Sequence, residues 1–326
     1  MQKPNDVIAI GSILVDLLVN VEESLIDKMQ LKKGEMHLIE EEQAKKILEE
    51  INYLQPQLAP GGSAANTIRA LGLLGSKVIL YGKIGDDQHG KFFLEELSKH
   101  NVVQKINLHH KPTGHCVSLI TPDAERTFSV FLGAAMEIVQ EDIVEEDIAL
   151  SKILHLEAYQ LEGQTRPAAL HALELAKKHN TLVSLDLADP ALIRRNKELF
   201  KGLVENKIDI IFANEQEAKE FTGLEEEAAL LELAKHAKIA VVKLGVRGSL
   251  IRYNDETIKI SAFPAEAVDT TGAGDTFAAG FLHGYCQGWS MEKSGKLGSL
   301  LAAKIVENMG VDYLKCSIKE TLNELD

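Results

Sequence analysis

Short runs of apolar residues alternate along the chain with segments whose apolar residues recur at helical spacing. The apolar runs are rich in β-branched residues, as expected for strands buried on both faces of a sheet. They are Val7–Ile10, Val78–Tyr81, Ile153–Leu156, Leu182–Leu185, Ile208–Ala213 and Ile239–Leu244. The helical segments between them are Asn66–Leu74, His89–His100, Pro167–His179 and Glu215–Thr222. This order predicts an α/β layered fold with a mostly parallel central sheet.

Other parts of the chain depart from this alternation. Ser249–Tyr253 and Thr257–Ile260 flank a polar turn, which predicts an antiparallel hairpin at one sheet edge. From Thr276 onward the pattern is almost wholly helical. The stretches 13–38 and 112–133 are either parts of a small β-sheet lid or ordinary surface excursions, and we expect no helix in 13–38. Since no linker or repeat interrupts the chain, we predict a single domain over 1–326 with this lid inserted in it.

Composition and charge exclude several classes of protein. The chain has 326 residues, is 45% hydrophobic and carries a formal net charge of −14. A net negative protein binds phosphate backbones poorly, so we expect no nucleic-acid partner. No apolar run is long enough for a membrane span, and no signal peptide is recognisable, so we expect no membrane partner and a cytoplasmic location. The 3 cysteines are far apart, which argues against disulfides and a structural zinc site.

The segment Val268–Gly280 carries the most informative chemistry. Gly272 and Gly274 let the backbone approach a ligand without an intervening Cβ atom. Their amides, with that of Asp275, open onto the start of an Ala-rich helix, which predicts an anion-binding nest strengthened by the helix dipole. Asp275 at the mouth of this nest is a candidate base for a hydroxyl group. The alternative is an ordinary acidic N-cap.

A second glycine pair, Gly61 and Gly62, precedes the helical segment that begins near Asn66. Asp16 follows the first predicted strand, at the carboxyl end where α/β folds bind ligands. A carboxylate together with a carboxamide suits the recognition of vicinal hydroxyl groups. For Asp16 taken alone, a solvated loop acid is the alternative.

Two common nucleotide motifs do not account for the late glycine segment. Gly272, Gly274 and Phe277 fail the G-x-G-x-x-G pattern because the third position is aromatic. The segment also lies too late in the chain for a leading dinucleotide-binding unit, which argues against a dehydrogenase. A Walker-type phosphate loop is absent from the sequence.

The combination of the two glycine segments is more specific than either alone. Gly61–Asn66 and Asp269–Asp275, in this order and separation, resemble the two signatures of the ribokinase-like (PfkB) kinase family. The resemblance extends over Gly82–Asp87, the N-x-x-E pattern at Asn214–Glu217 and the turn at Lys243–Ser249, and so covers nearly the whole chain. It implies a three-layer α/β/α ribokinase-like sandwich with a small β-sheet lid, and an ATP-dependent kinase.

The resemblance also implies roles for individual residues. Asp275 matches the catalytic base, and the amides of Gly272, Ala273 and Gly274 match the anion hole for the transferred phosphoryl group. Contacts with the acceptor hydroxyl groups are implied for Asp16, Gly62 and Asn66. The resemblance places Asn214, Glu217, Lys243, Gly245, Gly248 and Asn308 on the nucleotide side of the site. It implies that Glu217 positions Mg²⁺ through water. Lys243 stands at a position where the family commonly has Thr. Asp269 and Thr271 fall near the position of a monovalent cation such as K⁺.

The acceptor is a finer question. LAPGGSAANT at 58–67 and RTFSVFLGA at 126–134 resemble the bacterial adenosine-kinase-like group, so we expect transfer to the 5′-hydroxyl of a ribosyl nucleoside. Phe128 or Phe131 could stack on its base or belong to a core. A kinase of a free sugar, of ribokinase or fructokinase type, is the alternative, and a catalytically idle nucleotide or metabolite sensor is a further one. A homodimer through the lid is left open.

Overall fold

The predicted apolar runs form strands of the larger of two sheets. The computed structural model describes residues 3–123, 125–313 and 315–325. Within them the large sheet contains β1 (Asn5–Ile10), β5 (Val78–Gly85), β6 (Val102–His109), β9 (Ser151–Glu157), β10 (Leu182–Asp186), β11 (Ile210–Asn214), β12 (Ile239–Lys243), β13 (Ser249–Tyr253) and β14 (Glu256–Ile260). Their order is β14-β13-β12-β11-β10-β9-β1-β5-β6. Pairing is parallel from β6 to β12 and antiparallel in the β13–β14 hairpin, as predicted.

Most of the helices cover the two faces of the large sheet, whereas the first two pack on the smaller sheet described below. In order they are α1 (Glu23–Lys28), α2 (Glu41–Ile51), α3 (Ser63–Leu73), α4 (Gln88–Ser98), α5 (Glu145–Ala149), α6 (Arg166–Lys178), α7 (Pro190–Lys207), α8 (Glu215–Thr222), α9 (Glu226–Leu233), α10 (Ala273–Cys286), α11 (Met291–Val306) and α12 (Ile318–Thr321). Alternate residues of β1 enter different cores. Val7 and Ala9 pack with α3, α4, α10 and α11, whereas Ile8 and Ile10 pack with α5 to α9. The result is the expected three-layer α/β/α sandwich.

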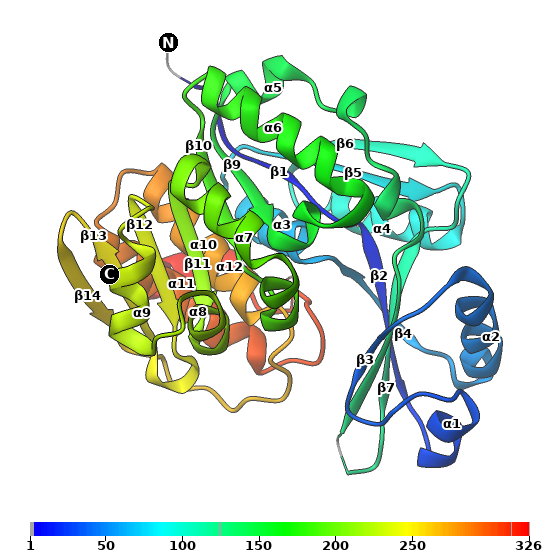
Figure 1. Ribbon diagram of the computed structural model, residues 1–326. Coiled ribbons are helices and arrows are strands. Elements are labelled where there is room, and N and C mark those ends of the chain that lie inside the picture. The colour runs from blue at the N-terminus through cyan, green and yellow to red at the C-terminus, as the bar shows by residue number, and fades with distance from the viewer. Residues whose placement is uncertain (1–2, 124, 314, 326) are drawn as a thin grey trace.

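The second sheet stands away from the main body (Figure 1). It contains β2 (Leu14–Asn20), β3 (Met36–Leu38), β4 (Gln57–Gly61), β7 (Gly114–Ile120) and β8 (Arg126–Phe131), in the order β3-β8-β7-β2-β4. We call it the small sheet. Alternate residues of β2, such as Val15 and Leu17, are buried in a cluster with Ile26 of α1 and Ile47 of α2. The other face of the small sheet therefore lies toward the main body.

The structure also contains elements that the periodicity did not reveal. β4 and β6 were missed, as were the long helix α7 and the short helix α5. The expectation of no helix in 13–38 was wrong, because α1 forms one and a half turns whose Ile26 is buried under the small sheet. No helix in the described part of the chain is both long and apolar enough to cross a bilayer.

Candidate active site

The start of α10 holds a group of free backbone donors. Gly272 is the N-cap residue, and its φ of 75° is a left-handed conformation that favours glycine. The N–H of Ala273 donates to the Thr270 carbonyl at 3.2 Å. The N–H groups of Gly272, Gly274 and Asp275 have no hydrogen-bond partner among the described residues, as is usual for the first turn of a helix. These open donors at the start of α10, which we call the nest, therefore include Asp275 and not Ala273.

Asp275 does not cap its own helix. Its carboxyl group turns toward α3, where Ser63 Oγ donates to Oδ1 at 2.6 Å and Asn66 Nδ2 donates to Oδ2 at 3.0 Å. Burial raises the pKa of Asp275 to about 6, although the Ser63 and Asn66 hydrogen bonds oppose the shift. The acidic N-cap interpretation is thus wrong. The structure brings the two glycine segments of the sequence together, with Asp275 and Asn66 as direct partners.

Asp16 lies on the main-body side of the small sheet, near the same place. A Cβ atom on Gly61 would stand 2.5 Å from Asp16 Oδ1, so a larger residue at position 61 would force this carboxylate to shift. Asp16 has no hydrogen-bond partner within the described residues. Burial raises its pKa to about 7, with Arg69 opposing the shift and Asp269 and Asp275 adding to it. An unpartnered, half-covered carboxylate of this kind can accept a hydrogen bond from a ligand hydroxyl.

Gly62 is the N-cap residue of α3 and lies against the loop that joins β1 to β2. Its φ is 95°, and a Cβ atom there would lie 2.0 Å from the Ser12 carbonyl oxygen. Glu157, at the end of β9, accepts from Ala64 N at 2.9 Å and from Ser12 N at 3.3 Å. Burial, with a contribution from Asp275, raises the pKa of Glu157 to about 7. Glu157 was not predicted as a site residue, although a carboxylate directly after the apolar run Ile153–Leu156 is a usable signal.

A buried ion pair lies on the other side of the nest. Lys243, the last residue of β12, contacts Asp186, the last residue of β10, with 2.8 Å between Nζ and Oδ2. A Cβ atom on Gly274 would stand 2.9 Å from Lys243 Nζ, so the ammonium group lies against the nest itself. Burial lowers the pKa of Lys243, but Asp186, Glu217 and Asp275 outweigh it and the net shift is upward. Lys243 was predicted as a site residue, whereas its partner Asp186 was not.

The N-x-x-E segment forms the start of α8. Asn214 accepts from Glu217 N at 2.9 Å, and Glu217 Oε2 accepts from Asn214 N at 2.7 Å, which is a reciprocal capping box. Glu217 Oε1 also accepts from the Asn214 side chain, and burial raises the pKa of Glu217 to about 7. Among the described residues, no three His, Cys, Asp or Glu side chains are grouped closely enough to hold a metal ion. Both carboxylate oxygens of Glu217 already accept hydrogen bonds from Asn214, an arrangement that suits contact with Mg²⁺ through water.

Asp269 and Thr271 are engaged by a residue of the small sheet. Arg126, at the start of β8, forms an ion pair with Asp269 Oδ1, and its Nη1 lies 3.5 Å from Thr271 Oγ1. Asp269 Oδ1 also accepts from Thr271 N at 2.9 Å, and Oδ2 accepts from Gly310 N at 2.8 Å. These contacts do not fit the expected monovalent cation, because a guanidinium group already meets the carboxylate that would bind it.

The remaining predicted residues lie at the same sheet edge or beyond it. Gly245 and Gly248 bound an exposed turn after β12 and have φ values of 57° and 90°. Asn308 follows α11, and its amide donates to Lys304 O at 3.2 Å and to Cys316 Sγ at 3.3 Å. Asn308 thus closes the end of its own helix and does not join the cluster around Asp275.

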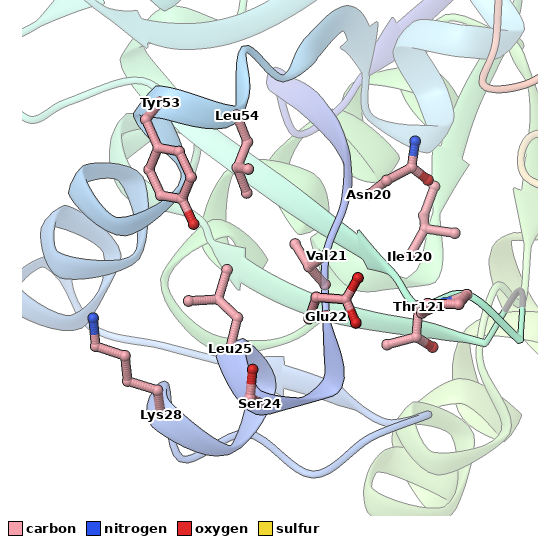
Figure 2. Close-up of a pocket in the computed structure, with 11 residues that line it drawn as sticks. Asn20, Val21, Glu22, Ser24, Leu25, Lys28, Tyr53, Leu54, Ile120 and Thr121 are labelled. Carbon is pink, nitrogen blue, oxygen red and sulfur yellow. The ribbon is translucent and has the colours of Figure 1, made fainter.

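A hollow on the small sheet is separate from this site (Figure 2). It has a volume of about 500 Å³ and lies between α1 and the ends of β2 and β7, with Tyr53 and Leu54 at its rim. None of the predicted site residues lines it. Within the described chain, the polar side chains that the two glycine segments predict converge elsewhere, around the start of α10.

Comparisons with known proteins agree with this geometry. The profile of the pfkB family of carbohydrate kinases matches residues 5–316. The structure of a probable sugar kinase from Rhizobium etli has a TM-score of 0.90 at 31% identity, covering 100% of both chains. The adenosine kinase from Sinorhizobium meliloti has a TM-score of 0.89 at 32% identity, covering 99% of this chain and 100% of that one. A 5-dehydro-2-deoxygluconokinase from Geobacillus thermodenitrificans is 28% identical over 94% of this chain and 89% of its own length.

The match to the family covers nearly the whole chain and both sheets, so the resemblance expected from the two glycine segments is confirmed. The relatives include kinases of sugars and of adenosine, which leaves the acceptor class at the level of carbohydrate or nucleoside. The chain belongs to the pfkB family of carbohydrate kinases and is an ATP-dependent kinase with the ribokinase-like fold.

Proposed function

We propose that the protein transfers the terminal phosphoryl group of ATP to the 5′-hydroxyl of a ribosyl nucleoside, with Asp275 as the base. The observation that carries the chemistry is the carboxylate of Asp275 beside the unpartnered N–H groups at the start of α10. Phosphoryl transfer depends on positioning and on stabilising negative charge, and backbone donors at a helix N-terminus supply both.

Each site residue has a role in this scheme. Asp16 and Asn66 orient the acceptor hydroxyls, and Gly62 lets the acceptor approach the backbone. Asp275 takes the proton of the attacking hydroxyl, while the N–H groups of the nest hold the transferred phosphoryl group. ATP lies along the C-terminal edge of β11 and β12. Glu217 would hold Mg²⁺ through water, and the bound ion would neutralise phosphate charge. The nucleotide side of the site would be formed by Asn214, Lys243 and the Gly245–Gly248 turn. Asn308 would serve by fixing the end of α11.

The nucleoside preference rests on the face of the small sheet that carries Asp16. In the strand register Asp16 pairs with Cys116 and Cys116 with Val130, so these side chains share one face. Phe128 and Met36 lie on the same face, with Met36 52% exposed. The same face also carries Ser118 and, at the start of β8, Arg126. Its apolar part, beside the carboxylate of Asp16, suits a ribose with an attached base better than a free sugar, whose carbons nearly all bear a polar group.

The two candidate aromatic residues behave differently. Phe131 belongs to the opposite face, where it is 7% exposed and packs 5.4 Å from the His115 ring, centroid to centroid. Phe128 is half-buried on the Asp16 face. We therefore assign base stacking to Phe128 alone.

An ADP-release assay with purified enzyme tests the acceptor. Nucleosides, pentoses, ketoses and 5-dehydro-2-deoxygluconate are compared with and without Mg²⁺. We expect turnover on a nucleoside, and we expect Phe128→Ala to raise KM for it by about tenfold, the value of one aromatic stack. Tyr53→Ala, at an exposed aromatic away from this face, is the control. Turnover on a free sugar alone, with no change of KM in Phe128→Ala, would instead establish a sugar kinase, as the relatives from Rhizobium and Geobacillus suggest.

The raised pKa of Asp275 predicts the acid side of the pH profile. The base acts only when ionised, and its pKa lies near 6. We expect kcat to fall by about tenfold for each pH unit below that value and to level off above it. Initial rates at saturating substrates over the acidic range check this. A rate that stays constant down to about pH 4, the ordinary carboxyl range, contradicts the assignment.

A further inference from the structure

The contact between Arg126 and Asp269 joins the small sheet to the loop that precedes the nest. Arg126 is the first residue of β8, and its side chain is 18% exposed. Its guanidinium meets three groups of the main body: Asp269, Thr271 and the Met309 sulfur, which lies 3.2 Å from Nη2. These groups come from the loop before α10 and from the segment after α11.

Asp269 is the residue that holds these two segments together. Its backbone N–H donates to the Val306 carbonyl at 3.0 Å, and its side chain accepts from the N–H groups of Thr271 and Gly310. The side chain is 2% exposed. Two backbone N–H groups and the Arg126 guanidinium group all meet this carboxylate, an arrangement that stabilises its ionised form. A buried carboxylate in this state needs a positive partner.

The direction of the nest depends on this loop. Thr271, held by Asp269 and facing Arg126, is followed directly by Gly272, whose N–H is one of the open donors. A charge that fixes Asp269 and Thr271 therefore fixes the direction in which the nest donors point. The resemblance implied a monovalent cation near Asp269 and Thr271, but here the Arg126 guanidinium group already meets this carboxylate.

We propose that Arg126 takes the place of a bound monovalent cation: its guanidinium group holds Asp269 and Thr271, aligns the nest at α10, and makes this kinase independent of K⁺. This assignment rests on the proposed phosphoryl transfer at the nest. Because Arg126 belongs to the small sheet, the charge reaches the loop only when that sheet lies against the main body.

The experiment compares wild type, Arg126→Met, Arg126→Lys and the control Arg166→Met. Arg166 is also partly buried, but it donates to Leu161 O and to Asn196, away from the site. Rates are measured with the acceptor found above, in KCl, NaCl or tetramethylammonium chloride at equal ionic strength. We expect wild type and Arg166→Met to show the same rate in all three salts. Arg126→Met should lose about 10- to 100-fold in kcat in NaCl and recover part of it in KCl, and Arg126→Lys should lose less.

A second measurement does not need an acceptor. Thermal unfolding of the ligand-free proteins should shift upward in KCl relative to NaCl for Arg126→Met and not for wild type, because only the variant has an unpaired Asp269. Stimulation of wild type by K⁺, or an Arg126→Met variant with the wild-type rate in every salt, overturns the proposal. A loss that neither KCl nor Arg126→Lys relieves also counts against it. If no acceptor is phosphorylated at all, the proposed function fails, while the thermal comparison still decides the role of Arg126.

Discussion

Asp275→Asn is expected to lower kcat by about a thousandfold while leaving ATP affinity close to that of wild type. Asparagine has nearly the same shape and can still hydrogen-bond to Ser63 and Asn66, the two partners of the native carboxylate. What it cannot do is take a proton from the attacking hydroxyl. The loss should therefore fall on kcat, measured by ADP release at saturating substrates, with nucleotide affinity followed by titration calorimetry.

Stability separates loss of the base from loss of the fold. The folded-state pKa of Asp275, about 6, lies above that of a carboxyl in an unfolded chain. Its contribution to stability is thus fully present at low pH and declines as pH rises from the ordinary carboxyl range through about 6. Asp275→Asn removes this decline, so the variant should be at least as stable as wild type at neutral pH. Asp142→Asn, at a carboxylate paired with Lys83, serves as the control and should keep its activity. Near-wild-type turnover by Asp275→Asn would remove the base from the mechanism.

Lys243→Met is expected to lower kcat by about a hundredfold or more, the size of effect seen when one stabilising group is removed from a developing anion. The cluster around the nest contains the carboxyl groups of Asp186, Glu217 and Asp275, and all three act on Lys243. Without the ammonium group the approaching phosphates meet uncompensated negative charge. Lys243→Arg keeps the charge, but a longer planar group must fit beside Gly274, so we expect an intermediate rate.

The matched control for Lys243 is Lys83→Met. Both lysines are largely buried and paired with an aspartate, with 2.8 Å between the charged atoms in each pair, and their side chains are 14% and 12% exposed. Each methionine variant leaves a buried carboxylate without its partner and should lower the melting temperature. Only Lys243→Met should lower kcat. Equal kinetic losses in the two variants would show that destabilisation, and not the charge at the nest, is responsible.

The sequence pattern predicts strands reliably where both faces are covered. β1, β9, β10, β11 and β12 appear as continuous apolar runs because helices cover the sheet on both sides. β6 was missed because it is an edge strand, with Val103 54% and Leu108 60% exposed. The helix α7 was missed because its apolar spacing is interrupted at Asn196, where φ is −122° and the helix is kinked. Periodicity fails where burial is one-sided or the helix is irregular.

The candidate site divides in the same way. Asp275 and Asn66 could be named as candidates because each lies in or beside a glycine segment, and the structure shows that the two side chains are hydrogen-bonded. The pairs Arg126–Asp269 and Lys243–Asp186 could not, because each depends on how distant strands and loops dock in three dimensions. The N-x-x-E pattern has a local physical explanation as well, since Asn214 and Glu217 cap α8 reciprocally.

Asp16 and Asp275, to which we assign the acceptor contact and the base of the proposed reaction, belong to different parts of the molecule. Asp16 lies on the small sheet, whose strand β4 runs through Gly62 directly into α3, whereas Asp275 lies on α10 of the main body. An acceptor that contacts both carboxylates uses part of its intrinsic binding energy to bring them together. Discrimination between acceptors should therefore appear chiefly as differences in turnover, and a truncated acceptor that reaches only one of the two carboxylates should bind as an inhibitor.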